Sequence, residues 1–259
     1  MEIIDSHIHP PLSDGSNLNW FSEAVRLETS EQYFDHLKRA GITRCCGAII
    51  QFPKGEYTFA SVAKMNQSAL EFHHKVGDFY LPGLQLDLDD PDKSCAELDH
   101  YYHKEGVRWI GELYARSITQ DSIVTPGAFE IYDLAQKLKV PISIYCMEKD
   151  FIWKICRQFP RLNLVLSHSA MTRNDLEPWL QLTREAGNLY LDLPPSITSR
   201  FGLIKMVVDE IGSHKVIFGS GFPIRCPQSA IASYLAAGLN DSQLETIFSL
   251  NFKRLTGIM

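Results

Sequence analysis

The chain opens with Met1-Glu-Ile-Ile-Asp5-Ser-His7-Ile-His9-Pro10, a short apolar run that leads into two histidines. Successive side chains of a β-strand point to opposite faces, so His7 and His9 share one face of an extended segment with Asp5. Two neutral imidazoles on one face are a suitable pair of ligands for zinc and its neighbours. The same stretch could equally be an N-terminal strand with two hydrogen-bonded histidines, so the rest of the chain must decide.

The composition is that of an ordinary globular protein. The chain has 259 residues, of which 45% are hydrophobic and 22% charged, and its net charge is −6. With no basic run, nucleic acid is not an expected partner. No apolar segment approaches the roughly 18 residues of a membrane helix, and the N-terminus does not resemble a signal peptide. The six cysteines are scattered without a CxxC pair, which predicts reduced thiols and a cytoplasmic protein.

Short apolar segments alternate with helical patterns along the whole chain. After the first strand, strands are expected at 42–50, 79–86, 107–114, 141–145, 162–167, 189–193 and 216–219. Helices are expected at 18–26, from 29 or 30 to 40, and at 57–76, 91–103, 126–139, 149–159, 173–186, 201–211, 228–237 and 242–256. Capping boxes are predicted at Thr29-x-x-Gln32 and Ser242-x-x-Glu245.

Eight strand-and-helix units predict an α/β fold with a parallel sheet, and eight is the number of a (β/α)8 TIM barrel. The main competitor is an open doubly wound sheet. That fold would place a glycine-rich phosphate turn after the first strand, where this chain has Asp5-Ser-His7-Ile-His9. No linker or low-complexity segment divides the sequence. We therefore expect a single TIM-barrel domain over residues 1–259.

Active sites of TIM barrels lie at the carboxyl ends of the strands, and several polar residues fall there. His7 and His9 on the first strand, Glu112 on the fourth and His168 on the sixth could converge on one divalent metal. Zinc with such ligands lowers the pKa of its bound water to about 7. Each residue has a plainer interpretation: Glu112 could pair with a neighbouring arginine, His168 could bond to backbone, and Asp192 could be a turn residue or support a ligand.

Several stretches together resemble the amidohydrolase-related metal-dependent hydrolases. They are Asp5-x-His7-x-His9, Gly-Val-Arg-Trp-Ile-Gly-Glu112-Leu, Phe-Pro-Arg-Leu-Asn-Leu-Val-Leu-Ser-His168, Asn-Leu-Tyr-Leu-Asp192 and Lys-Val-Ile-Phe-Gly-Ser-Gly-Phe-Pro223. The likeness is to the branch that contains aminocarboxymuconate-semialdehyde decarboxylase and the dicarboxylate lactonases. The stretches occur in the family's order over residues 5–223. The resemblance implies a barrel with one divalent metal per chain, usually zinc, held by the histidine pair of the first strand.

Two positions depart from the family pattern. The family's histidine on the fifth strand is replaced by Tyr145, and the strand-eight motif Gly-Ser-Asp-Phe-Pro has Gly221 in place of its aspartate. In the family this aspartate is a metal ligand and the usual general base. Glycine offers no oxygen for either role. The sequence contains no nearby residue that replaces it.

Three outcomes follow from these departures. The metal could be held by His7, His9, Glu112 and His168, with Asp192 or Glu112 as the base. The site could instead be metal-free and bind a small acid through Tyr114, Tyr145 and Arg225, because a cation there could pair with a carboxylate. Finally, the protein could be non-catalytic and retain only the barrel.

The leading prediction is a metal-dependent hydrolase that acts on a small carboxylated or cyclic metabolite through a metal-activated water, or else a decarboxylase. In this prediction His168 and Asp192 are catalytic, and His168 moves a proton or polarises the substrate. The alternative is a weakened or metal-free member of the family that binds a small ligand or a partner. Assembly into a homo-oligomer is left open.

Overall fold

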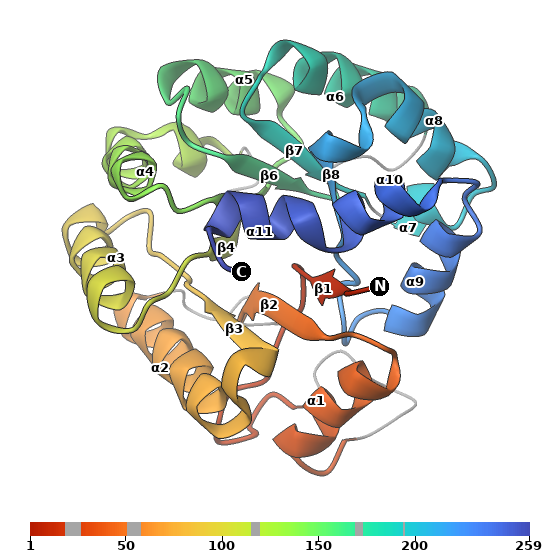
Figure 1. Cartoon of the computed structure of the whole chain (residues 1–259). Helices are drawn as coiled ribbons and strands as arrows, with labels where there is room; N and C mark the ends of the chain where they lie inside the picture. Colours follow the sequence, from red (N-terminus) through yellow and green to blue (C-terminus); the bar gives the residue numbers. More distant parts are fainter. Residues whose placement is uncertain (19–26, 51–57, 115–119, 169–172, 194) are drawn as a thin grey trace.

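The computed structural model describes the chain except residues 19–26, 51–57, 115–119, 169–172 and 194. Eight parallel strands form the centre of the molecule (Figure 1). They are β1 (Ile4–Asp5), β2 (Arg44–Ala48), β3 (Tyr80–Gly83), β4 (Ile110–Tyr114), β5 (Ile142–Tyr145), β6 (Leu164–Ser167), β7 (Leu189–Asp192) and β8 (Val216–Ile217). Each strand pairs in parallel with the next one along the chain inside two runs, β1-β2-β3 and β4 to β8.

Single β-bridges join the two runs into a closed barrel. One bridge pairs Leu84, just after β3, with Ile110 of β4, and the other pairs Ile8 with Phe222. Both bridges are parallel, as the strands are. The predicted (β/α)8 barrel is therefore confirmed. The strands are shorter than the apolar segments that predict them, since those segments continue into the turns that flank each strand.

The helices surround the strands in Figure 1. They are α1 (Ser30–Arg39), α2 (Phe59–Val76), α3 (Pro91–Lys104), α4 (Pro126–Leu138), α5 (Lys149–Gln158), α6 (Arg173–Glu185), α7 (Pro195–Thr198), α8 (Leu203–Ile211), α9 (Pro227–Leu235), α10 (Asp241–Glu245) and α11 (Asn251–Thr256). A π-helical turn, Thr246–Leu250, connects α10 to α11. Most of the helix expected at 18–26 lies outside the described residues, and the short α7 is an element that the sequence did not predict.

Side-chain caps mark the beginning of several helices, among them α1 and α10. Thr29 caps α1 by accepting a hydrogen bond from the Gln32 amide, as predicted, but the Gln32 side chain binds the Glu28 amide and does not complete the box. The second predicted box is wrong by two residues. Asn240 and Gln243, not Ser242 and Glu245, exchange the reciprocal hydrogen bonds at the start of α10.

The core has an outer layer and a filled barrel interior. The outer layer consists of the apolar faces of the strands and helices. A separate cluster contains Ile4, Cys46, Trp109, Val165, Tyr190 and Ile217 from the strands and their starts, together with Phe252 and Leu255 of α11. In Figure 1, α11 lies across the opening of the barrel. The amino ends of the strands are thus closed by apolar packing, which leaves the carboxyl ends for a polar site.

Candidate metal centre

Three buried side chains converge at the carboxyl ends of β1 and β4. The Nε2 atoms of His7 and His9 lie 3.1 Å apart, and Glu112 Oε2 lies 3.6 Å from the first and 3.9 Å from the second. Among the residues that the structure describes, this is one group of histidine and carboxylate donors close enough together to share an ion. All three side chains are about 5% exposed or less.

The distances suit a divalent metal. Two donor atoms that each lie about 2.1 Å from a tetrahedral zinc ion are about 3.4 Å apart, close to the three separations seen here. Two neutral imidazoles whose acceptor nitrogens face one another at 3.1 Å need a cation or a proton between them. The residues present therefore fit a metal by both spacing and donor type.

Asp192 at the end of β7 holds the ring of His7. Its Oδ2 lies 2.5 Å from His7 Nδ1, so that the proton on Nδ1 is donated to the carboxylate. This interaction selects the tautomer whose Nε2 can coordinate a metal, an arrangement typical of metal-bound histidine. The sequence left open whether Asp192 is a turn residue or supports a ligand, and the geometry favours the support of His7.

Gly219 allows this pair to form. A Cβ atom at Gly219 would lie 2.5 Å from the His7 Cβ and 2.9 Å from both carboxylate oxygens of Asp192. Contacts between non-bonded carbon atoms are normally about 3.5–4.0 Å. The chain after β8 thus passes so close to the His7–Asp192 pair that any side chain at this position would push the two residues away.

Glu112 is positioned by its strand and by Gln85. The register between β4 and β5 shifts between Ile110 and Leu113, an irregularity of the kind that redirects a side chain. The buried Gln85 donates from Nε2 to the Glu112 carbonyl at 2.8 Å, and Gln85 itself is held through its backbone on both sides by Asn66 of α2. Gln85 was not among the predicted site residues, because a single glutamine after a strand carries no distinctive pattern.

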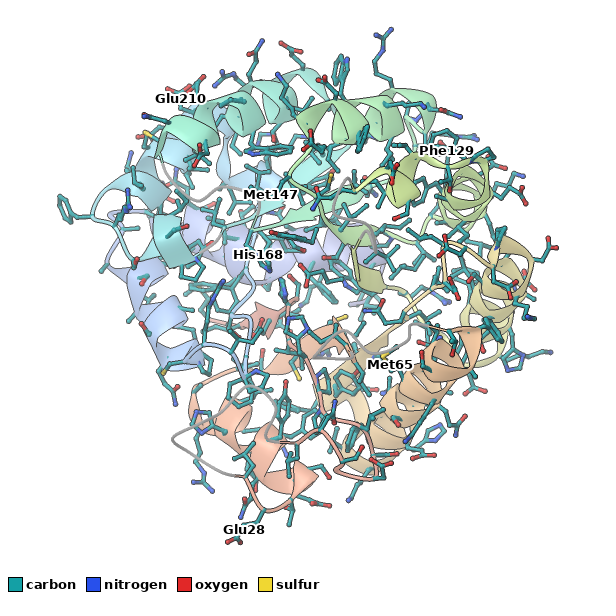
Figure 2. The ribbon with its side chains drawn as sticks, turned by 180° about the vertical axis from the view of Figure 1, so that it is seen from behind. Glu28, Met65, Phe129, Met147, His168 and Glu210 are labelled. Carbon is teal, nitrogen blue, oxygen red and sulfur yellow. The ribbon has the colours of Figure 1, made fainter. Side chains whose placement is uncertain are left out.

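His168 lies at the accessible side of the cluster. Its Nε2 is 3.2 Å from Glu112 Oε1, its ring stacks on that of His7 at a centroid distance of 5.1 Å, and the side chain is 24% exposed. Figure 2, viewed from behind, shows His168 in the middle of the ring of strands. The Tyr145 ring lies 5.3 Å from that of His168. His168 thus contacts the cluster and can still be reached from outside.

Arg225 lies beside Gly221 at the same end of the barrel. A Cβ atom at Gly221 would be 3.6 Å from Arg225 Nη1, with no closer contact. The half-buried guanidinium forms no hydrogen bond or ion pair within the described part of the chain. Burial lowers the pKa of Arg225, and the carboxylates of Asp192 and Glu112 oppose this effect. Tyr114 pairs with Tyr145 in the sheet, but its side chain lies outside the described part of the structure.

The cluster has a strongly polarised charge distribution. Burial lowers the pKa of His7, but the carboxylates of Glu112 and Asp192 outweigh burial and raise that pKa to about 10. Burial and the positive charge of His7 lower the pKa of His9 to about 3. The histidines hold the pKa of Glu112 well below its usual value, although burial acts in the other direction. The carboxylates therefore attract one positive charge to the centre of the cluster.

Asp5 is not one of the donors. Its Oδ1 accepts hydrogen bonds from the backbone amides of His7 and Ser220, and burial raises the pKa of its carboxyl group to about 6. Strand alternation predicted that Asp5 shares a face with the two histidines. The two histidines do converge, but the Asp5 carboxylate is not part of the donor group that could share an ion. Asp5 instead connects the turn after β1 to the turn after β8.

The family is decided by a match over nearly the whole chain. A model of the family described as amidohydrolase matches residues 4–257. The chain belongs to this amidohydrolase family. No curated protein sequence gives a significant match. The resemblance inferred from the strand-end motifs is confirmed, and family membership places the chain among enzymes of this superfamily.

Solved structures share the fold at low sequence identity. One is 2,6-dihydroxybenzoate decarboxylase from Rhizobium, with 14% identity, coverage of 100% of this chain and 99% of that chain, and a TM-score of 0.76. Another is 5-carboxyvanillate decarboxylase from Novosphingobium aromaticivorans with bound manganese, with 12% identity, coverage of 99% and 96%, and a TM-score of 0.73. A third is 4-oxalomesaconate hydratase from Rhodopseudomonas palustris, with 16% identity, coverage of 98% and 95%, and a TM-score of 0.71.

Within the described residues, no helix combines the length and the apolar character that crossing a membrane requires.

Proposed function

We propose that this amidohydrolase is a metal-dependent enzyme of the hydrolase or decarboxylase type that acts on a small carboxylated or cyclic metabolite. The observation that carries the proposal is the convergence of His7, His9 and Glu112 on one point, with ligand-like spacing and almost no exposure. Buried charged groups are costly unless they are paired or hold a metal. The three side chains would hold the ion, and His168 is a candidate fourth ligand.

A divalent metal in this position supplies Lewis acidity, which polarises a substrate oxygen and makes a proton of water easier to remove. The donor set of two histidines and one glutamate is found in catalytic zinc sites, which supports zinc. The manganese in the related decarboxylase structure supports manganese by analogy. We keep zinc as the first choice and one ion per chain as the expected content.

His168 is the residue best placed to move a proton. It is the most exposed member of the cluster, and its Nε2 contacts Glu112 Oε1. A proton could pass between Nε2 and a substrate that enters from the accessible side. Asp192 acts through His7, whose ring it orients, so we assign it a positioning role. Its predicted direct catalytic role stays a prediction.

Arg225 and Tyr145 would bind the substrate. Arg225 has no ion-pair partner among the described residues, and an arginine beside an anionic cluster can form a bidentate pair with a substrate carboxylate. Tyr145 borders His168 and could donate a hydrogen bond, since its pKa is raised by burial and its hydroxyl keeps its proton. The names of the related decarboxylases make hydroxylated benzoic acids a reasonable first panel of substrates.

The metal part of the proposal is tested by elemental analysis of protein purified without chelator. We expect about one zinc or manganese ion per chain, lost in His9→Ala and reduced in Glu112→Gln. His103→Ala is the matched control, because His103 is an exposed histidine of α3. A content far below one ion per chain, unchanged by added zinc or manganese, would contradict the proposal. The reaction is then sought by carbon dioxide release from the panel and by proton release from lactones.

A second candidate function rests on Gly221. With no side-chain oxygen at this position, the site has one acid fewer than the family pattern that the sequence resembles. The protein would then bind a small carboxylate without turning it over. Gly221→Asp separates the two functions, because aspartate tolerates the left-handed backbone found there (φ +70°) and would have Arg225 as a neighbour. Activity that appears only in Gly221→Asp would favour the binding function for the native chain.

A further inference from the structure

A groove of about 740 Å3 lies on the face of the barrel opposite the metal centre. It is formed by segments that precede β4 and β6, by the end of α4 and by the end of α11. Among the described residues, its walls contain five cationic residues and no aspartate or glutamate. We call this hollow the basic groove. Its cationic residues are Arg108, Lys137, Lys139, Arg161 and Arg254. On a chain with a net charge of −6, this concentration of one sign is a local exception.

The helix ends beside the groove do not account for Lys139 and Arg161. Basic residues near a helix carboxyl end often bind its last carbonyl groups. Here the end of α4 is already closed, because the amides of Lys139 and Val140 bind the carbonyls of Gln136 and Ala135. The end of α11 is closed in the same way by the amide of Gly257. The side-chain charges of Lys139 and Arg161 are therefore not used to bind the last carbonyl groups of α4 or α11.

Two of the arginines are held in place. Arg108 donates from Nη1 to the carbonyls of Tyr102 and Val107, and its guanidinium lies 4.0 Å from the centre of the Tyr102 ring. Arg254 donates from Nη2 to the carbonyl of His214 and to Asn251. Each guanidinium has five N–H donors, so several remain for a ligand. A fixed side chain loses little conformational entropy when it binds.

Two other cations have no protein partner in the described part of the chain. Lys139 and Arg161 are exposed, and neither side chain forms a hydrogen bond or an ion pair there. Lys137 differs, since it pairs with Asp133. The groove thus offers four cations to a ligand, two fixed and two able to close on it.

We propose that the basic groove binds a phosphorylated small molecule with at least two negative charges. Arginine forks match the oxygens of phosphate, and several cations around one hollow favour a multiply charged group over a single carboxylate. The volume lies within the range of about 300–1,000 Å3 that is usual for small-molecule sites. Nucleic acid fits less well, because it would need the basic surface to continue beyond this groove. This binding is independent of the function proposed for the metal centre.

Isothermal titration calorimetry with inorganic pyrophosphate and with ATP at 50 mM salt tests the proposal. The groove variant is Lys139→Glu/Arg161→Glu. The control is Arg39→Glu/Lys104→Glu, which makes the same change in net charge at exposed cations outside the groove. We expect the groove variant to bind at least about tenfold more weakly and the control to change less than about threefold. Circular dichroism checks that both variants are folded.

Comparison of ATP with pyrophosphate shows which part of a ligand the groove binds. Tighter binding of ATP than of pyrophosphate identifies a nucleotide, and equal binding identifies phosphate groups alone. Both results support the site. No binding of either probe at 1 mM overturns it, as does equal weakening in the two double variants. Binding that is lost in His7→Ala but kept in the groove variant also overturns it, because the anion would then lie at the metal centre.

Discussion

Replacement of Gly219 by alanine should damage the metal centre through a single methyl group. The added Cβ would lie 2.5 Å from the His7 Cβ, about 1 Å or more inside normal contact distance, and 2.9 Å from both oxygens of Asp192. His7 must therefore move by about 1 Å, whereas its Nε2 is only 3.1–3.6 Å from the other two donors. Overpacking of this kind costs about 1–3 kcal/mol of folding free energy. Disturbing the support of a ligand typically lowers metal affinity about 10- to 100-fold.

Two measurements check this prediction. Thermal unfolding followed by circular dichroism should show a Tm lower by about 2–12 °C, given about 2–4 °C per kcal/mol for a chain of this size. Titration against a competing chelator should show the weaker metal binding. Gly187→Ala is the matched control, because no atom lies within 4 Å of a Cβ there. Native Tm and native metal affinity in Gly219→Ala would refute the reasoning.

Three further predictions follow from the site and the core. Asp192→Asn keeps the shape of the side chain but removes its charge, so we expect metal affinity about tenfold lower in the chelator titration, with little change in Tm. Arg225→Ala should weaken binding of a carboxylated ligand about tenfold or more at unchanged metal content, and Arg225→Lys should restore part of that binding. Equal binding by the native protein and both variants would exclude an ion pair between Arg225 and the ligand. A thiol reagent should modify the exposed Cys226 in the folded protein and leave Cys45 and Cys46 unmodified. Both of these are buried, and burial raises the pKa of their thiols well above the usual value. Fast reaction of all three cysteines would contradict this prediction.

The sequence was sufficient for the architecture because the repeating pattern is strong. Eight apolar segments separated by helical patterns have few alternatives to a parallel barrel, and the histidine pair excluded a phosphate-binding turn. Boundaries were less predictable. The apolar run before Gly219 continues past Ile217, where β8 ends, since burial and strand pairing do not stop at the same residue. At α10, Asn240 competes with Ser242 as a cap, and the structure uses Asn240.

The candidate site could be predicted only in part. His7, His9 and Glu112 come together as expected, because strand ends meet at one face of a barrel. The hydrogen bond between Asp192 and His7 joins residues 185 positions apart, and nothing in the sequence pairs them. Gln85 was not predicted, because a single glutamine after a strand forms no recognisable motif. The zinc preference, the cytoplasmic location and the state of assembly stay predictions.

Because single β-bridges join the two runs of strands, a metal bound at this site would also affect the stability of the barrel. His7 and His9 follow β1 of the three-stranded run, whereas Glu112 lies in β4 of the five-stranded run, so an ion held by the three residues would tie the two runs together. Backbone hydrogen bonds also cross the seams, among them those from the Gly111 amide to the Leu84 carbonyl and from the Gly221 amide to the His7 carbonyl. Removal of the ion should therefore speed hydrogen exchange at the amides of Gly111 and Gly221 far more than inside β5 and β6. In this barrel, the residues that would perform the chemistry would also help to hold the two runs of strands together.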